Sequence, residues 1–419
     1  MEAALAAAET ECGIIPAEAA QAIESAARLA ALDVARIERG IAETSHPLMA
    51  LVTELSMAAG EHGGWVHWGA TTQNITQTGD VLVLRDAHRK ILRLLAAVLM
   101  AAADLAERTA DMLAAGRTHG QHAVPITFGF KPAGWIDELV RHVTRLRAAE
   151  GRVFTAMTGG AVGNFASLGQ AGPRVQDAVA ARLGLAPMAV PSRAVVDSFA
   201  EYVCLLGLLG ATGTRIALEV FQLMKTELAE ASEPAPPGTV GSSTMPHKRN
   251  PQLSDDCITI GAQLRALVPL ALEAMLHDHE VDGAHSAMLD DALRRACVLA
   301  GDLLVRLEVI VSGLEVDPAR MRANLALSGG MISSEAVMLG LGQAIGRQTA
   351  HEVVYDAARA EGTTFADALK RDPRVTAHLD AAAIDRLLDP AGHTGLSHSM
   401  ARAAAQRARA TAHDITAAW

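Results

Sequence analysis

Residues 195–231 read VVDSFAEYVCLLGLLGATGTRIALEVFQLMKTELAEA, a long helical pattern whose apolar positions exceed a single stripe. Similar apolar-rich helical patterns cover residues 131–157, 253–276 and 287–314. Because an α-helix rises about 1.5 Å per residue, these segments predict an elongated bundle of long helices. Such helices in one chain would leave part of their apolar surface in water, so we expect a homo-oligomer.

The composition agrees with an all-α protein. Of the 419 residues, 50% are apolar but only 3% are aromatic. Ala, Leu, Val and Ile dominate the apolar positions, which suits closely packed helices. The length allows about two or three domains. Shorter helical patterns before the bundle and after residue 329 predict three domains, over residues 1–88, 89–331 and 332–419.

The charge and the cysteines limit the partners and the compartment. The net charge of −11 is spread without a Lys/Arg run, which argues against nucleic-acid binding. The four cysteines form no CxxC pair, which indicates free thiols in a reducing cytoplasm. Glu2 stands where a secretory signal carries positive charge, and the apolar runs are shorter than the roughly 20 residues of a membrane span. We expect a cytoplasmic protein with no membrane partner.

Polar loops interrupt the helical patterns at residues 60–79, 116–125 and 232–251. An irregular loop as long as the last is more often a lid or a binding loop than a plain connection. Its end, GSSTMPHKRNP at residues 241–251, offers groups that stabilise a carbanion beside a carboxylate. Lys248 supplies a point charge, and Asn250 an amide donor. The hydroxyl of Ser242 becomes a base only if nearby positive charge stabilises its alkoxide, which Lys248 and loop closure would provide.

Residues 241–251 resemble the signature loop of the fumarase/aspartase superfamily. HWGATTQ at residues 67–73 and GRTHGQHAVP at residues 116–125 resemble its two other site regions, in the same order and spacing. The resemblance covers nearly the whole chain and is closest to the branch of adenylosuccinate lyase and 3-carboxy-cis,cis-muconate cycloisomerase. It implies a three-domain all-α fold, with the signature loop over residues 238–251. It also implies a homotetramer with sites shared between subunits, and an N-terminal segment that this chain lacks.

The resemblance assigns roles to particular residues. Ser242 is the base that removes the Cβ proton of a small dicarboxylate, and Lys248 and Asn250 hold the resulting aci-carboxylate. His119 is the general acid toward the leaving group, with His67 a second candidate. Asp255 follows the loop where relatives pair an acid with the site histidine, and it would orient the imidazole and raise its pKa. The other implied substrate-binding residues are Thr71, Thr72, Gln73, Thr118, Gln121, Ser243 and Met245.

The reaction that this set predicts is anti β-elimination from an N-substituted or amino-succinate to give fumarate, or its reverse, with no cofactor. Adenylosuccinate lyases carry an arginine where Val281 stands here, which argues against a nucleotide substrate. Cycloisomerases generally lack a histidine at the position of His119. Relatives commonly have acids at the positions of Asn74 and Gln77, which indicates a differently built pocket. A cycloisomerase-like enzyme, a lyase with nitrite or another non-amine leaving group, and a catalytically silent helical binding protein remain alternatives.

Histidines and aspartates that could ligate a metal gather at His277, Asp278, His279, Asp282 and His285. A helix through this segment would point His277 and His279 to different faces. We therefore expect no metal there.

Overall fold

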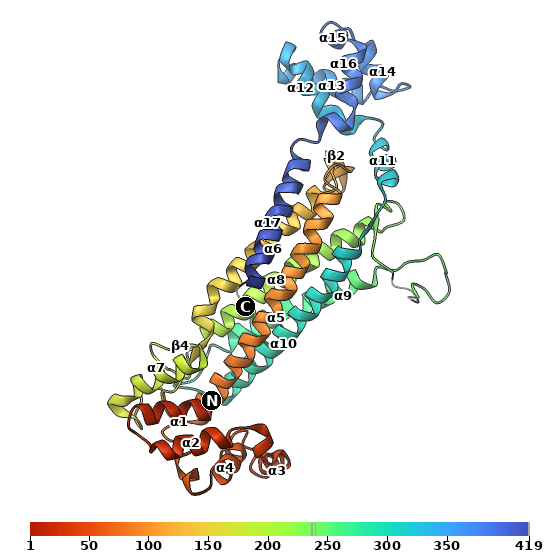
Figure 1. Ribbon diagram of the computed structural model, residues 1–419. Helices are drawn as coiled ribbons and strands as arrows, with labels where there is room; N and C mark the ends of the chain where they lie inside the picture. The colour runs from red at the N-terminus through yellow and green to blue at the C-terminus, as the bar shows by residue number, and fades with distance from the viewer. Residues whose placement is uncertain (236–237, 239, 418–419) are drawn as a thin grey trace. The chain divides into compact units, whose positions relative to one another are not determined.

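The computed structural model describes residues 1–235, 238 and 240–417. Its chain forms two compact units. Unit 1 comprises Met1–Ile91, Thr144–Leu208 and Gln263–Ala300, and unit 2 comprises Leu92–Val143, Leu209–Ala262 and Gly301–Trp419. The long helices contribute residues to both units: α5 (Thr72–Arg108), α6 (Phe130–Val153), α8 (Asp197–Leu223), α9 (Gln252–Glu273) and α10 (Gly283–Gly313) (Figure 1).

These long helices confirm the all-α prediction. Each expected apolar pattern forms a helix, and α5 begins inside the first polar loop rather than after it. In unit 1, a Cβ atom on Gly207 of α8 would lie 2.5 Å from Val268 of α9, so the two backbones approach closely there. In unit 2, a Cβ atom on Gly213 would meet Leu303 of α10 at 2.8 Å. The predicted division into three domains stays a prediction.

Short helices open unit 1. They are α1 (Glu2–Glu11), α2 (Ala17–Ala26), α3 (Val34–Thr44) and α4 (Met49–Ala58). Leu5, Ile23 and Leu55 are buried between them. The carboxylate of Asp33 accepts a hydrogen bond from Arg36 N and caps α3, which is why that helix starts there.

The rest of unit 1 ties α7 (Gly172–Leu183) to the long helices. Strands β3 (Thr155–Ala156) and β4 (Ala186–Pro187) pair in parallel beside it. Val175 and Val179 of α7 pack in one core cluster with Leu5 of α1 and Ile75 of α5. The N-terminal end of α5, where the first predicted site region lies, is therefore held by the short helices and by α7.

A β-hairpin in unit 2 replaces the polar loop that the sequence predicts at residues 116–125. Strands β1 (Leu113–Thr118) and β2 (Gln121–Thr127) pair antiparallel, with Thr118 opposite Gln121. The two residues between them, His119 and Gly120, have φ values of 51° and 75°. A two-residue hairpin turn of this kind needs positive φ at both positions, and glycine meets that need without strain.

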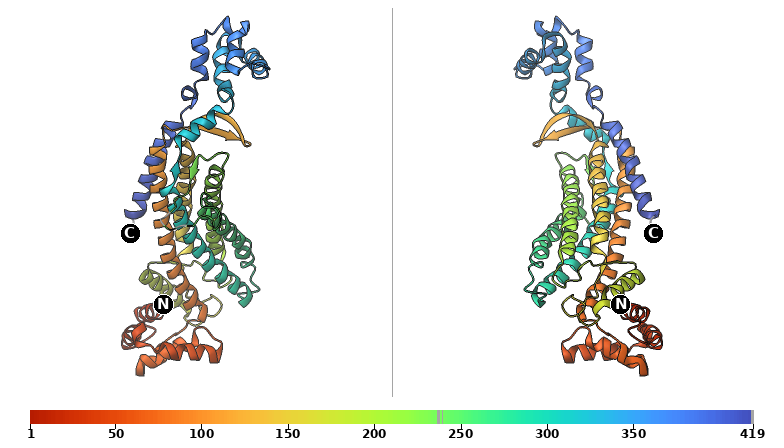
Figure 2. Two further views of the ribbon diagram at one scale, coloured as in Figure 1. Left: turned by 90° about the vertical axis from the view of Figure 1, so that its right-hand side faces the viewer. Right: turned by 90° about the vertical axis from the view of Figure 1, so that its left-hand side faces the viewer.

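The C-terminal part of unit 2 consists of the shorter helices that the sequence predicts after residue 329. Buried Val337, Leu341, Val353, Leu369 and Ile384 form their core. The last helix, α17, instead lies along α5 and α6, where Arg402 pairs with Asp111 and Arg407 with Asp137 (Figures 1 and 2). The elements are β5 (Ala231–Ser232), β6 (Glu315–Val316), α11 (Pro318–Ala326), α12 (Ser334–Ile345), α13 (Arg347–Ala358), α14 (Phe365–Arg371), α15 (Pro373–Thr376), α16 (Ala381–Leu388) and α17 (Ser397–Ala417).

Helix α8 is long and apolar enough, by length and composition, to cross a membrane. In the most apolar 18-residue window of this helix, 61% of the residues are buried inside the protein. Core helices of soluble proteins pass the same test, so this one helix is weak evidence for a span.

Candidate active site

The β1–β2 turn carries one group of predicted site residues. Thr118, His119 and Gln121 are all exposed at its tip. The hairpin is anchored close to its turn, because Arg117 binds the fully buried carboxylate of Glu230 through two hydrogen bonds of 2.9 and 2.5 Å. Asn324 donates a further hydrogen bond of 2.7 Å to the same carboxylate. His119 is therefore exposed to solvent on a turn whose neighbouring residue is fixed by buried hydrogen bonds.

Charge compensation explains how Glu230 tolerates burial. Burial acts to raise the pKa of its carboxyl group, but the hydrogen bonds from Arg117 and Asn324 and the charge of Arg117 outweigh this effect. The net result is a lowered pKa, so Glu230 stays ionised. The same guanidinium, together with burial as the larger cause, lowers the pKa of His122 on the neighbouring strand.

The signature loop carries the second group. Its described residues fold back on themselves, so that a Cβ atom on Gly241 would lie 2.5 Å from the carbonyl oxygen of Lys248. The Oγ atom of Ser242 accepts a hydrogen bond of 3.1 Å from Met245 N, and Lys248 N donates to Met245 O. Ser242 and Asn250 are half-buried, while the predicted residues Ser243, Met245 and Lys248 are exposed.

Two acids anchor the C-terminal end of this loop. Arg249 Nη1 donates to Glu315 Oε2 at 2.9 Å, and Nη2 donates to the carbonyl oxygen of Glu233 at 2.6 Å. The buried carboxylate of Glu233 accepts from Leu253 N and Ser254 N, which caps the start of α9. The Gly241–Lys248 turn thus projects from a fixed end.

Asp255 lies exposed on the first turn of α9. In the described part of the chain its carboxylate has neither a hydrogen-bond nor an ion-pair partner, while the adjacent Asp256 pairs with Arg306 at 3.0 Å. Among the residues that the structure describes, no hydrogen bond or ion pair joins Asp255 to a histidine of the same chain. Its role as the orienting acid stays a prediction.

The third group lies in unit 1, around His67. This residue has a left-handed backbone with φ of 63°, and its Nδ1 atom lies 2.7 Å from Oε1 of Glu2. The two side chains are only 16% and 7% exposed, respectively. Non-glycine residues in such a conformation often mark functional sites, because the surrounding structure must hold them there. Glu2 was not among the predicted site residues.

Hydrogen bonds fix the predicted residues at the start of α5. The fully buried side chain of Asn74 accepts from Thr71 N and from Gly160 N through Oδ1, both at 3.1 Å. Asn74 therefore supplies the acceptor that an acid at this position would supply. Gln73 accepts from Arg193 Nε at 2.7 Å and donates to Gln77 Oε1 at 2.8 Å.

A cavity of about 1150 Å³ opens in unit 1 beside these residues. Thr72, Gln73 and Gln77 of α5 line it together with Arg193. A second part of its lining comes from the start of α10 and the segment before it. These residues are His277, Val281, Asp282, Ser286, Asp290 and Arg294. Burial and the negative charge of Asp290 raise the pKa of Asp80, which also lines the cavity. The cavity is thus lined by charges of both signs.

The predicted site residues fall into these three groups. His67, Thr71, Thr72 and Gln73 lie in unit 1, and the others lie on the β1–β2 turn, on the signature loop or on α9 in unit 2. Among the residues that the structure describes, no hydrogen bond or ion pair joins His119 to Ser242 or Lys248. Sequence reasoning missed Glu2 and Arg193, because nothing in the local pattern marks contacts between residues so far apart in the chain.

Comparisons with known proteins add to this geometry. The family described as Lyase matches residues 1–265, and the family described as adenylosuccinate lyase C-terminus matches residues 330–404. An N-acetyl-S-(2-succino)cysteine lyase of Enterococcus italicus is 40% identical over 94% of this chain and 88% of its own length. A 3-carboxy-cis,cis-muconate cycloisomerase of Pseudomonas aeruginosa is 39% identical over 99% of this chain and 91% of its own.

Solved structures agree with this picture. The crystal structure of a fumarate lyase from Mesorhizobium sp. BNC1 is similar to this one with a TM-score of 0.90 and 35% sequence identity. The similarity covers 97% of this chain and 93% of that one. The fold is thus shared over nearly the whole chain.

Proposed function

The chain belongs to the fumarase/aspartase superfamily and is a lyase of its adenylosuccinate lyase-like branch, and on this premise we propose that it cleaves the bond between C2 of a substituted succinate and sulfur, giving fumarate and a thiol. The observation that carries the choice of sulfur is the 40% identity to an N-acetyl-S-(2-succino)cysteine lyase over 94% of the chain. In a compound of that name, a succinate carbon is bonded to the sulfur of a cysteine.

The proposed reaction begins with proton removal from C3. Ser242 takes this proton, and the electron pair of the C–H bond moves into the neighbouring carboxylate, which becomes an aci-carboxylate. Lys248 and Asn250 would stabilise that charge, because both offer donors at the base of the same folded loop. The electron pair then forms the C2–C3 double bond as the C–S bond breaks, and the bonding electrons leave on sulfur.

A complete site requires more than one chain in this proposal. The hairpin turn and the signature loop expose Thr118, His119, Ser243 and Lys248 to solvent in a single subunit. The resemblance to the superfamily implies a homotetramer in which loops of different subunits meet. We propose that these exposed groups close over the His67–Gln73 region of another subunit.

The leaving group distinguishes this proposal from its main rival, an amine. The match of residues 330–404 to the adenylosuccinate lyase C-terminus favours an amine. However, Val281 borders the unit 1 cavity in place of the arginine that such enzymes carry, which argues against a nucleotide. A free thiol has a pKa of about 8.5, so a thiolate can depart without protonation, whereas an amine must receive a proton as it leaves.

The test uses the purified full-length protein and a panel of succinates. S-(2-succino)cysteine, its N-acetyl derivative, adenylosuccinate and N-succinyl amino acids are each incubated with the enzyme. Fumarate is followed by ultraviolet absorbance, and free thiol by a thiol-specific reagent. The proposal expects equal amounts of fumarate and thiol from a thioether, and none with Ser242→Ala. If only adenylosuccinate or the N-succinyl amino acids released fumarate, the enzyme would be a C–N lyase and the sulfur proposal would be wrong.

A further inference from the structure

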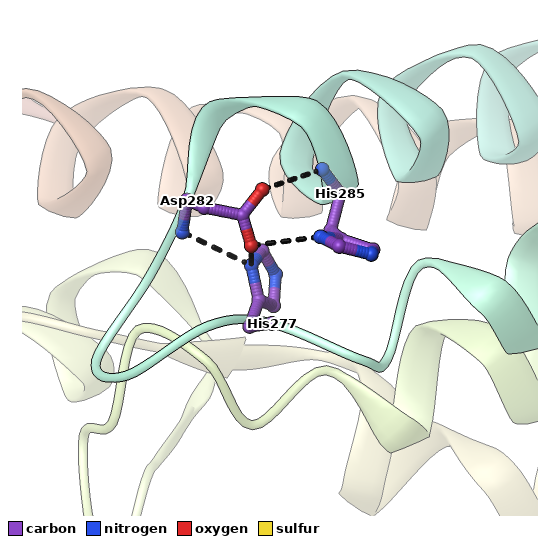
Figure 3. Close-up of side chains that lie close together, drawn as sticks. All are labelled: His277, Asp282 and His285. Atoms are coloured by element: carbon purple, nitrogen blue, oxygen red, sulfur yellow. Dashed lines mark hydrogen bonds and ion pairs between the residues drawn. The ribbon is translucent and has the colours of Figure 1, made fainter.

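Three side chains outside the proposed mechanism form a compact cluster beside the unit 1 cavity (Figure 3). The Nδ1 atom of His285 lies 2.7 Å from Oδ2 of Asp282, and Nδ1 of His277 lies 3.1 Å from the same oxygen. Each of the three residues offers one atom that could bind a metal, an imidazole nitrogen or a carboxylate oxygen, and these three atoms all lie within 4.8 Å of one another. His277 and Asp282 also line the cavity.

The local fold removes the reason for excluding a metal from this segment. The chain is irregular from His277 to Asp282, and α10 begins only at Gly283, so no helix separates the histidines. The turn brings His277 against the first turn of α10, where His285 lies, while His279 stays outside the cluster. The sequence argued against a metal here because a continuous helix would separate the histidines, and the structure has no helix over residues 277–282.

Backbone hydrogen bonds hold the carboxylate in place. Oδ1 of Asp282 accepts from Ala284 N at 2.9 Å and from His285 N at 3.0 Å, and Oδ2 accepts from Asp278 N at 3.0 Å. The carboxylate therefore caps α10 and is pre-positioned between the two imidazoles.

Protein groups alone leave the His277 ring incompletely satisfied. Its side chain is 1% exposed, and its Nε2 atom is buried without a partner among the residues described. Its Nδ1 atom lies 3.2 Å from Asp282 N, which donates, and 3.1 Å from the Asp282 carboxylate, which accepts. A single ring nitrogen cannot accept from the first and donate to the second at once. One of these contacts is unfavourable whichever tautomer is present.

The set of atoms suits a divalent transition metal. Two imidazole nitrogens and one carboxylate oxygen are ligands that Zn²⁺ prefers, and three protein ligands leave one tetrahedral position for water or another ligand. With bonds of about 2.0 Å, ligand atoms of a zinc site lie about 3.3 Å apart. The Nδ1 atoms of His285 and His277 lie 2.7 and 3.1 Å from Asp282 Oδ2, so these separations would widen by about 0.6 and 0.2 Å on binding.

We infer that His277, Asp282 and His285 form a binding site for Zn²⁺ or a similar divalent transition-metal ion. The bound ion fixes the first turn of α10 and this wall of the cavity. The site is separate from the acid–base residues of the proposed elimination, so its test does not depend on the reaction.

The test is a calorimetric titration of the chelator-treated protein with Zn²⁺. The expected result is one ion per chain and an affinity that His285→Ala weakens by about 100-fold or more. Zn²⁺ should also raise the thermal unfolding temperature of the unaltered protein but not that of His285→Ala. Co²⁺ in the site should give the intense visible absorption of a tetrahedral complex.

His279→Asn is the matched control, because His279 lies in the same turn, outside the cluster, with φ of 53° that asparagine tolerates. It should bind Zn²⁺ as the unaltered protein does. A milder change, His285→Gln, guards against misfolding and should also weaken binding. Equal affinity in the unaltered protein and in folded His285→Ala, or no saturable binding at all, would overturn the inference and leave a hydrogen-bonded helix cap.

Discussion

At the residue scale, the role of His119 depends on what leaves the substrate. An amine requires a proton donor, whereas a thiolate does not. We expect His119→Asn to reduce kcat by about 10² to 10⁴ with an N-succinyl substrate, the usual contribution of a general acid. With an S-succino substrate we expect a loss of less than about 10-fold. Parallel kcat measurements of both substrates check this, and equal losses would show that departure of the thiolate also needs a proton from His119.

A second residue, Glu9, makes stability depend on pH. Its fully buried carboxyl group has no partner among the described residues, and burial, followed by the negative charge of Glu2, raises its pKa from 4.5 to about 8. The folded state thus holds its proton more tightly than the unfolded state. This contribution to stability is complete below pH 4.5 and is lost as the pH rises to about 8.

Glu9→Gln should therefore gain stability relative to the unaltered protein as the pH rises from 5 to 8. The expected gain is on the order of 1.4 kcal/mol per pH unit within that window. Urea unfolding at several pH values measures it. The exposed Glu18→Gln, on the neighbouring helix, serves as the control. Parallel pH curves for Glu9→Gln and the unaltered protein would show that Glu9 does not titrate in this way.

At the scale of elements, the β1–β2 hairpin depends on one buried ion pair. Arg117→Met leaves the carboxylate of Glu230, fully buried in the structure, without its cation, and we expect a loss of about 3–5 kcal/mol in the free energy of unfolding. Adding Glu230→Leu removes the unpaired charge and should recover much of this loss. Chemical denaturation of both single variants and the double variant forms the cycle. Additive losses would show that the two side chains are not coupled.

At the scale of the whole molecule, the proposed homotetramer must cover apolar side chains that one chain leaves exposed. Val298 on α10 is 71% exposed, and Leu208 on α8 and Leu272 on α9 are each 49% exposed. We expect Val298→Asp to break the assembly into smaller species, as measured by light scattering, and to abolish activity because the sites are shared. Val190→Asp is the control, since Val190 is 70% exposed but lies outside the long helices. An intact, active Val298→Asp oligomer would exclude this face as an interface.

The sequence predicted the elements better than the connections between them. Helix periodicity and apolar content located α6, α9 and α10 to within about four residues, since these signals are local. The pattern at residues 195–231 found the start of α8 but ran past its end at Leu223 into β5. The hairpin was missed because Gly116 and Pro125 favour a loop, and its turn depends on the φ angles of His119 and Gly120. The turn at His277 was missed for a related reason, because it depends on the Asp282 carboxylate, which caps α10 at Gly283 and meets His277 only in the folded chain.

By itself, the sequence determined that this protein is helical and that its signature loop carries serine, lysine and asparagine side chains suited to carbanion chemistry. Only the tertiary structure decided that Glu2 reaches His67, that Arg193 reaches Gln73, and that two histidines meet at Asp282. The physical reason is the range of the interactions. Helix formation is governed by neighbours three and four residues apart, whereas a hydrogen bond such as that between Glu2 and His67 joins residues that only the folded backbone brings together.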